Sequence, residues 1–205
     1  MFKPAPPSTP RLILIAGCTG TGKSTFGMNI ALSEGIMKCI STDTLRQVMR
    51  SFTSHDAIHR SSYSGSGHAA TQWLETAAVL NPAIVSVVDD SIKRRNSLVL
   101  EGVHIVPGND IIRRWEEAHG FGVGVLLVIS DQEAHRKLIY QRGKILKTGA
   151  KGQLDAFNRI REIQSTMIER AEKHNWMIIE QQLAPNPMDA ISEYFEMRQS
   201  TKPRV

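Results

Sequence analysis

The residues best suited to chemistry lie near the start of the chain, directly after the apolar run 12–16. Their pattern is G-x-x-x-x-G-K-[ST], in which glycines let backbone N–H groups turn inward around phosphate oxygens. The Lys23 ammonium would reach the β- and γ-phosphates of a nucleotide, and the Ser24 hydroxyl would ligate Mg²⁺. The segment that we expect to bind the phosphates comprises Gly17, Cys18, Thr19, Gly20, Thr21, Gly22, Lys23, Ser24 and Thr25.

This loop needs a strand before it and a helix after it, and the surrounding sequence predicts both. A helix at about 23–34 would point the positive end of its dipole at the same anion. Along the rest of the chain, short apolar runs alternate with helical stretches, which predicts a three-layer α/β fold with a five-stranded parallel sheet covered by helices. The expected strands are Arg11–Ala16, Met37–Ser41, Ser97–Glu101, Val123–Ser130 and Trp176–Glu180. The expected helices are 23–34, 44–51, 68–79, 81–95, 109–119, 131–142, 153–174 and 187–198.

In parallel sheets of this kind, ligands bind at the carboxyl ends of the strands, so the residues that follow each strand are of interest. Asp43 and Arg46 follow the second expected strand and lie three residues apart, on one face of a helix. Asp43 would accept the proton of an attacking hydroxyl, and Arg46 would pair with an anionic acceptor. The structural alternative is a helix-capping aspartate with a surface arginine.

The third expected strand ends at Glu101, followed after two residues by His104. An acid at this point would hold Mg²⁺ or its water, so Ser24 and Glu101 form the expected metal site. Which of Asp43 and Glu101 is the base and which supports the metal stays open at this stage. His104 would bind a phosphate or carboxylate of the acceptor, the alternative being a packed loop histidine.

Arginines follow the fourth expected strand, in a segment at about 131–152 that would close as a lid. Arg136 and Arg142 would neutralise charge on the phosphates in the transition state, as catalytic residues alongside Lys23 and Asp43. The alternative is a solvated basic helix.

Composition sets the class of protein. The chain has 205 residues with 41% hydrophobic and 22% charged residues, which suits one globular domain. We expect a flexible segment at 1–10, a domain at 11–198 and a tail at 199–205. No apolar run approaches the length of a membrane span, and with only Cys18 and Cys39 a disulfide framework is excluded, so a cytoplasmic location is predicted.

The formal net charge is +5, which suits anionic ligands such as nucleotides, sugar phosphates or nucleic acid. Basic clusters at 93–95 and 113–114 lie within helical stretches and carry no interleaved aromatic residues. A solvated helix face is therefore favoured over a nucleic-acid surface. No pattern in the sequence indicates an oligomeric state.

Several segments together resemble the 2-phosphoglycerate kinase family. They are the phosphate loop, residues 42–50, the Ser61-Ser62-Tyr63 loop and the stretch from Glu101 to Gly108, and the resemblance covers roughly residues 11–182. The Glu-Gly-Val-His-x-Val-Pro-Gly stretch is the most specific piece, because very many proteins share the phosphate loop.

The resemblance implies a P-loop kinase fold and ATP-dependent phosphorylation of 2-phosphoglycerate to 2,3-bisphosphoglycerate, with Mg²⁺. From residues placed after strand ends and in the 61–63 loop, we expect a small anionic acceptor to be bound by Asp43, Arg46, Ser62, Tyr63 and His104. Asp43-x-x-Arg46 is also similar to the motif of polynucleotide 5′-hydroxyl kinases, and plant relatives are associated with inositol phosphates. The open alternatives are thus a polynucleotide, inositol or nucleoside kinase, and a nucleotide-binding switch without acceptor turnover.

Overall fold

The computed structural model describes residues 9–61, 63, 65–145, 150–181 and 187–200, the side chain of Pro187 excepted. Its centre is a five-stranded sheet with the order β2-β3-β1-β4-β5, in which every neighbouring pair is parallel. This confirms the predicted sheet. The strands are β1 (Arg11–Ala16), β2 (Cys39–Ser41), β3 (Leu98–Gly102), β4 (Phe121–Val128) and β5 (Met177–Glu180).

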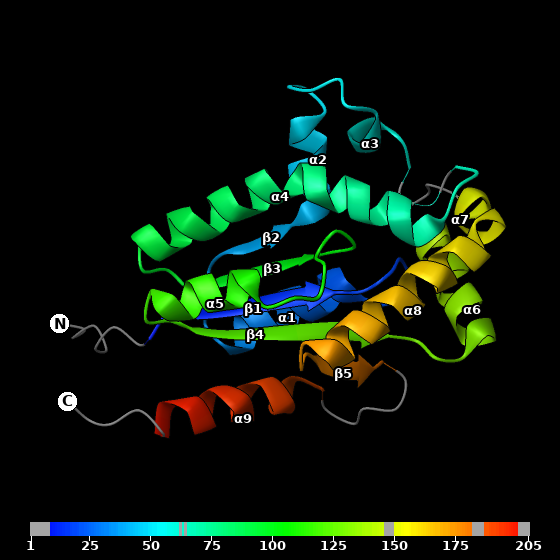
Figure 1. Cartoon of the computed structure of the whole chain (residues 1–205). Helices are drawn as coiled ribbons and strands as arrows, with labels where there is room; N and C mark the ends of the chain where they lie inside the picture. Colours follow the sequence, from blue (N-terminus) through cyan, green and yellow to red (C-terminus); the bar gives the residue numbers. More distant parts are fainter. Residues whose placement is uncertain (1–8, 62, 64, 146–149, 182–186, 201–205) are drawn as a thin grey trace.

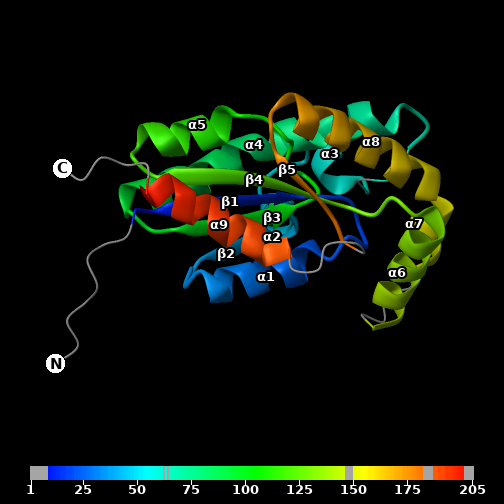
Figure 2. The ribbon, with the colours of Figure 1, turned by 90° about the horizontal axis from the view of Figure 1, so that it is seen from below.

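Helices cover both faces of the sheet (Figures 1 and 2). They are α1 (Lys23–Ser33), α2 (Thr42–Met49), α3 (Asp56–His59), α4 (Ala69–Lys93), α5 (Asp110–Glu117), α6 (Gln132–Ile145), α7 (Lys151–Asp155), α8 (Phe157–Lys173) and α9 (Pro187–Ser200). In Figure 1, α6 and α7 stand beyond the carboxyl ends of the strands. Among the described residues, no helix is long and apolar enough to cross a membrane.

Alternating strand residues build the two halves of the core. Leu12 and Leu14 of β1 face a cluster that includes side chains of α4, α5 and α8. Ile13 and Ile15 face the opposite way, into a cluster that includes side chains of α1 and α9. Because successive strand side chains point to opposite faces, the apolar run of β1 is buried on both sides of the sheet.

Helix α4 corrects the expectation of two separate helices at 68–79 and 81–95. It runs unbroken through Pro82, which lies on its exposed face. Ala78, whose carbonyl loses its partner at the proline, is also exposed, so water can solvate that carbonyl. Buried residues continue on one stripe on both sides of Pro82, and this packing holds the helix together: Trp73, Ala77, Leu80, Ile84 and Val88.

Other boundaries differ slightly from the expected ones. The helix expected at 153–174 is divided into α7 and α8 around Ala156, and the short helix α3 was not expected. The expected N-terminal segment and C-terminal tail fall largely on residues 1–8 and 201–205, which lie outside the described residues.

Strand register brings the expected site residues to one edge of the sheet. Glu101 of β3 lies opposite Ile15 of β1 on one side and Ser41 of β2 on the other. The phosphate loop, the start of α2 and the end of β3 therefore meet where the three strands end.

Candidate functional site

A cavity of about 1320 Å³ lies at this edge of the sheet. Its floor is the phosphate loop from Thr19 to Thr25, with Thr21 turned away. Asp43 and Glu101 also line it, as do residues from α6, α7 and α8. The structure therefore brings residues of the phosphate loop together with Asp43 and Glu101, as the sequence predicts.

The backbone of the phosphate loop requires glycine at two places that face the cavity. Gly20 has a φ of +84°, and an added Cβ there would lie 2.9 Å from Ile139 Cγ1. Gly22 has a φ of +78° and stands at the N-cap of α1 without a side chain to satisfy the first amides of that helix. Those N–H groups are left for an anion.

Ser24 and Glu101 form the contact that the metal prediction requires. The Ser24 hydroxyl donates a hydrogen bond to Glu101 Oε1 at 3.1 Å, although the two residues are far apart in sequence. Glu101 is buried, whereas Ser24 is exposed to the cavity. A hydroxyl and a carboxylate side by side are oxygen ligands of the kind that Mg²⁺ takes.

The donor set fits Mg²⁺ that is shared with a nucleotide. In the part of the chain that the structure describes, no group of three or more His, Cys, Asp and Glu side chains could hold a metal. Mg²⁺ commonly binds through one or two protein oxygens and takes its other ligands from substrate phosphates and water. Ser24 and Glu101 would hold it beside the phosphate loop.

The backbone of the phosphate loop positions the Lys23 side chain. Its ammonium donates to the Cys18 carbonyl at 2.7 Å. Burial lowers the pKa of Lys23, and the negative charges of Glu101 and Asp43 act against that shift. The lysine therefore sits in an environment that becomes more favourable for its charge when phosphates bind nearby.

Asp43 lies in the first turn of α2, exposed and lining the cavity. Its backbone N–H donates to the Ser41 hydroxyl at 3.2 Å, so Ser41 rather than Asp43 caps the helix. This leaves the Asp43 carboxylate available to a ligand and argues against the capping alternative.

The two arginines of the expected lid differ in position. Arg142 reaches over the phosphate loop and donates to Thr19 Oγ1 at 2.7 Å. Arg136 does not line the cavity; its guanidinium stacks 3.9 Å from the centre of the Phe157 ring. Of these two arginines, Arg142 lines the cavity and Arg136 does not.

Thr19 joins the loop to two other parts of the site. Its N–H donates to the Tyr63 hydroxyl at 3.1 Å, and its carbonyl accepts from His135 Nε2 at 2.8 Å. Arg161 approaches His135 Nδ1 at 3.4 Å and can only donate, which assigns the neutral Nε2–H tautomer to His135. Burial lowers the pKa of His135, which favours this neutral form.

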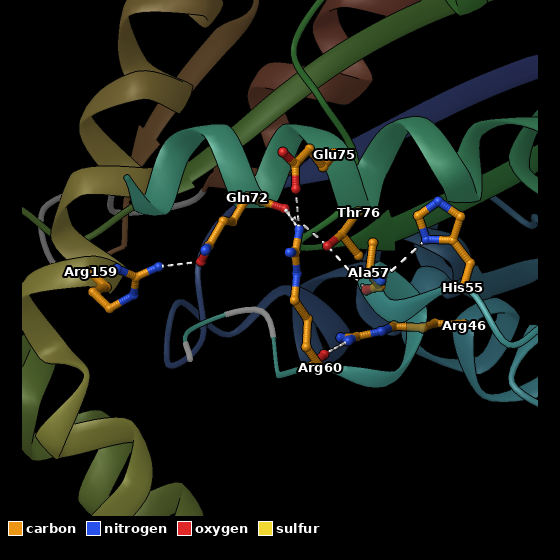
Figure 3. A network of polar contacts seen from close by, with 8 residues as sticks. All are labelled: Arg46, His55, Ala57, Arg60, Gln72, Glu75, Thr76 and Arg159. Atoms are coloured by element: carbon orange, nitrogen blue, oxygen red, sulfur yellow. Dashed lines mark hydrogen bonds and ion pairs between the residues drawn. The ribbon is translucent and has the colours of Figure 1, made fainter. Parts of the chain in front are cut away.

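Arg46 makes structural contacts that the sequence did not predict (Figure 3). It is only 7% exposed, and its guanidinium donates to the backbone carbonyls of Ile58 and Arg60. Arg60 in turn pairs with Glu75 of α4. Arg46 therefore fastens the segment after α2, although it still lines the cavity.

Other predicted residues lie behind the cavity wall. His104 is 1% exposed and does not line the cavity. Burial lowers its pKa to about 3, with the charges of Arg46, Lys23 and Arg50 acting in the same direction. Cys18 is buried beneath the loop, where burial raises the pKa of its thiol to about 12. Ser62 lies outside the described residues.

Sequence reasoning missed Arg50, which lines the cavity. The signal was present, because Arg50 lies seven residues after Asp43 and therefore near the same face of the helix. Arg159 also lines the cavity, and its guanidinium bonds to the Tyr63 and Gly67 carbonyls.

Comparisons with known proteins identify curated relatives of the chain. The chain is similar to a 2-phosphoglycerate kinase of Methanocaldococcus jannaschii, with 32% identity over 83% of this chain and 58% of the relative. One from Pyrococcus furiosus is 30% identical over 83% of this chain and 59% of the relative. The chain thus spans about three fifths of the length of these relatives.

Solved structures share the fold. Shikimate kinase from Acinetobacter baumannii superposes with a TM-score of 0.54 at 13% identity, with 97% of each chain covered. A protein from Thermus thermophilus gives a TM-score of 0.52 at 16% identity, covering 95% of this chain and all of that one. The three-layer fold is therefore that of the P-loop kinases.

A family model also matches almost the whole chain. It is described as Zeta toxin and covers residues 2–184, which include the phosphate loop, Asp43, Glu101 and Arg142. By this match, the chain belongs to the Zeta toxin family.

Proposed function

We propose that this chain is an ATP-dependent kinase that transfers the γ-phosphoryl group to a hydroxyl of 2-phosphoglycerate, giving 2,3-bisphosphoglycerate. The observation that carries the proposal is the Ser24–Glu101 contact beside Lys23, in one cavity with Asp43. A metal site and a lysine on one side, with an exposed carboxylate on another element, are the parts that phosphoryl transfer needs.

In this account, each group has one task. The loop amides, the start of α1 and Lys23 bind the phosphates, while Mg²⁺ would neutralise the charge that develops on them. Asp43 orients the acceptor hydroxyl and accepts its proton as the oxygen attacks. A bond forms between that oxygen and the γ-phosphorus, the bond to the bridging oxygen breaks, and ADP leaves. Arg142 stabilises the transferred group.

Two observations support the proposed acceptor: the arginines that line the cavity, and the similarity to curated proteins. Arginines line the cavity around Asp43, which suits an acceptor that carries its own negative charge. The curated relatives in the comparison are named 2-phosphoglycerate kinases. A small phosphorylated acid meets both conditions.

The assignment of Asp43 is tested by Asp43→Asn, with ADP release followed at saturating ATP and 2-phosphoglycerate. We expect kcat to fall by about 10²- to 10⁴-fold, because the amide cannot accept the proton. The KM for ATP should change by less than about twofold, since the phosphate loop is untouched.

Asp56→Asn is the matched control. Asp56 is also an exposed aspartate in the first turn of a helix, and it does not line the cavity. This variant should retain the kcat of the unmodified chain. An Asp43→Asn variant with unchanged kcat would remove Asp43 as the base.

A further inference from the structure

One wall of the cavity carries positive charge that protein acids do not neutralise. Among the described residues, no carboxylate lies within ion-pair distance of Arg50 or Arg159, although both line the cavity. By contrast, Arg60, which follows α3, is paired with Glu75 of α4. Arg50 and Arg159 donate only to neutral oxygens among the described residues, which leaves their charge for an anionic ligand.

Arg159 uses its hydrogen bonds to hold the loop that follows α3. Its Nε donates to the Tyr63 carbonyl at 3.1 Å, and its Nη atoms donate to the Gly67 carbonyl and to Gln72 Oε1. Figure 3 shows it reaching from α8 to Gln72 on α4. All three guanidinium nitrogens are thus engaged, so this arginine positions the wall of the site.

Arg50 retains hydrogen-bonding capacity. Its Nε donates to the Ile58 carbonyl at 3.2 Å and its Nη1 to Gln47 Oε1 at 2.9 Å. Nη2 donates to no residue in the described ranges, and its two N–H groups are therefore available to a ligand in the cavity.

Its position relative to Asp43 is fixed by α2. Asp43, Arg46 and Arg50 follow one face of the helix, with Arg50 at the C-cap about 10 Å along the axis from Asp43. Helical side chains lean toward the N-terminus, so the long Arg50 side chain extends back toward Asp43. The carboxylate and the guanidinium thus line one cavity from the two ends of the same helix.

The guanidinium of Arg50 is also held in place. Nε of Arg46 and Nε of Arg50 both donate to the Ile58 carbonyl, which keeps the two cations side by side. After burial, the charge of Arg50 is the largest cause that lowers the pKa of Arg46. A bound anion would relieve this repulsion, and little ordering of Arg50 is needed on binding.

We infer that Arg50 binds the acceptor, through a carboxylate or phosphate ester that stays on the acceptor throughout the reaction while Asp43 holds the hydroxyl. The inference rests on the proposed function, since it names the residue that selects an anionic acceptor at that site. It predicts that the acceptor is a hydroxy acid or a phosphate ester of a few carbons and not a neutral nucleoside or inositol.

The test is calorimetric binding to the full chain with Mg²⁺ and a non-hydrolysable ATP analogue. Three probes are titrated: 2-phosphoglycerate, glycerate, which lacks the phosphate, and glycerol 2-phosphate, which lacks the carboxylate. We expect Arg50→Gln to raise the Kd for 2-phosphoglycerate by about 10- to 100-fold, the range for loss of a hydrogen bond to a charged group. Arg50→Lys keeps the charge but loses the paired N–H donors of the guanidinium, so it should give an intermediate loss of affinity.

The single-anion probes separate recognition from structure. Arg50→Gln should raise the Kd of one single-anion probe as much as that of 2-phosphoglycerate. The Kd of the other probe should stay within about twofold, because that probe lacks the group that Arg50 binds. A merely structural role would weaken both alike. Arg113→Gln, which removes an exposed charge on α5 outside the cavity, should change none of the three.

Two results distinguish this inference from the proposed function. An unchanged Kd for 2-phosphoglycerate in Arg50→Gln, with turnover in the unmodified chain, overturns the inference alone. Binding that depends on Arg50, without acceptor-dependent ADP release, overturns the proposed function alone.

Discussion

At the scale of residues, one hydrogen bond distinguishes the two arginines of α6. Arg142 contacts Thr19 at the phosphate loop, whereas Arg136 stacks on Phe157 and comes within 4.0 Å of Glu133. Both lie on the same helix, where Arg142 is exposed and the Arg136 side chain is 39% exposed, so each is a matched control for the other.

We therefore predict that Arg142→Ala lowers kcat by at least about 10²-fold, because it removes charge stabilisation from the transferred phosphoryl group. Arg136→Ala should leave kcat within about threefold and lower the free energy of unfolding by about 1 kcal/mol, through the lost contact with Phe157. Steady-state kinetics and urea denaturation measure both. The reverse order of the two kcat values would contradict this assignment.

The sequence predicted some residues of the site better than others. Lys23, Ser24 and Glu101 were recoverable because a loop pattern and a strand end fix where their side chains point. The burial of His104 behind the cavity wall and the contacts of Arg46 with the segment after α2 were not, because both depend on packing between α2, α3 and α4 that no local pattern encodes.

At the scale of elements, the approach of α2 to β3 decides the distance between Asp43 and Glu101. Gly102, directly after Glu101, has a φ of +153°, and an added Cβ would lie 1.7 Å from Thr42 Oγ1. Thr42 is fully buried and precedes Asp43. A side chain at Gly102 must therefore displace the start of α2.

We predict that Gly102→Ala lowers the free energy of unfolding by about 3 kcal/mol, as overpacking and backbone strain combine. It should also lower kcat, since Asp43 moves with Thr42. Gly108→Ala is the control, because its added Cβ would meet nothing nearer than 3.8 Å and its backbone is not strained. Equal stabilities in urea denaturation for the two variants would rule out this role for Gly102.

The elements themselves were largely predictable, because apolar runs separated by helical periods specify a parallel sheet. Helix α4 shows the limit of that reasoning. Pro82 breaks a helix by local rules, yet here the proline and the carbonyl it frees are on the exposed face while a buried stripe continues. Which face a proline occupies becomes apparent only after the helix has docked.

At the scale of the whole molecule, the two core clusters pack on the faces of the sheet, and the cavity lies at one edge of it. The phosphate loop lies at the centre of that edge, with α2 on one side and α6 on the other (Figure 1). At about 1320 Å³, the cavity between them is larger than the roughly 300–1,000 Å³ of most single-ligand sites, as the proposed function requires. A kinase needs a nucleotide and a second small molecule at once, whereas a nucleotide-binding switch needs only the first.

The most direct test of this account is the rate of ADP release by the unmodified chain with ATP and Mg²⁺, measured with each of four acceptor classes. These are 2-phosphoglycerate, inositols, nucleosides and 5′-hydroxyl oligonucleotides, with products identified by phosphorus NMR. We predict acceleration by 2-phosphoglycerate alone, with 2,3-bisphosphoglycerate as product. A rate that no acceptor increases, or one that only an oligonucleotide increases with a steep dependence on salt, would contradict the account.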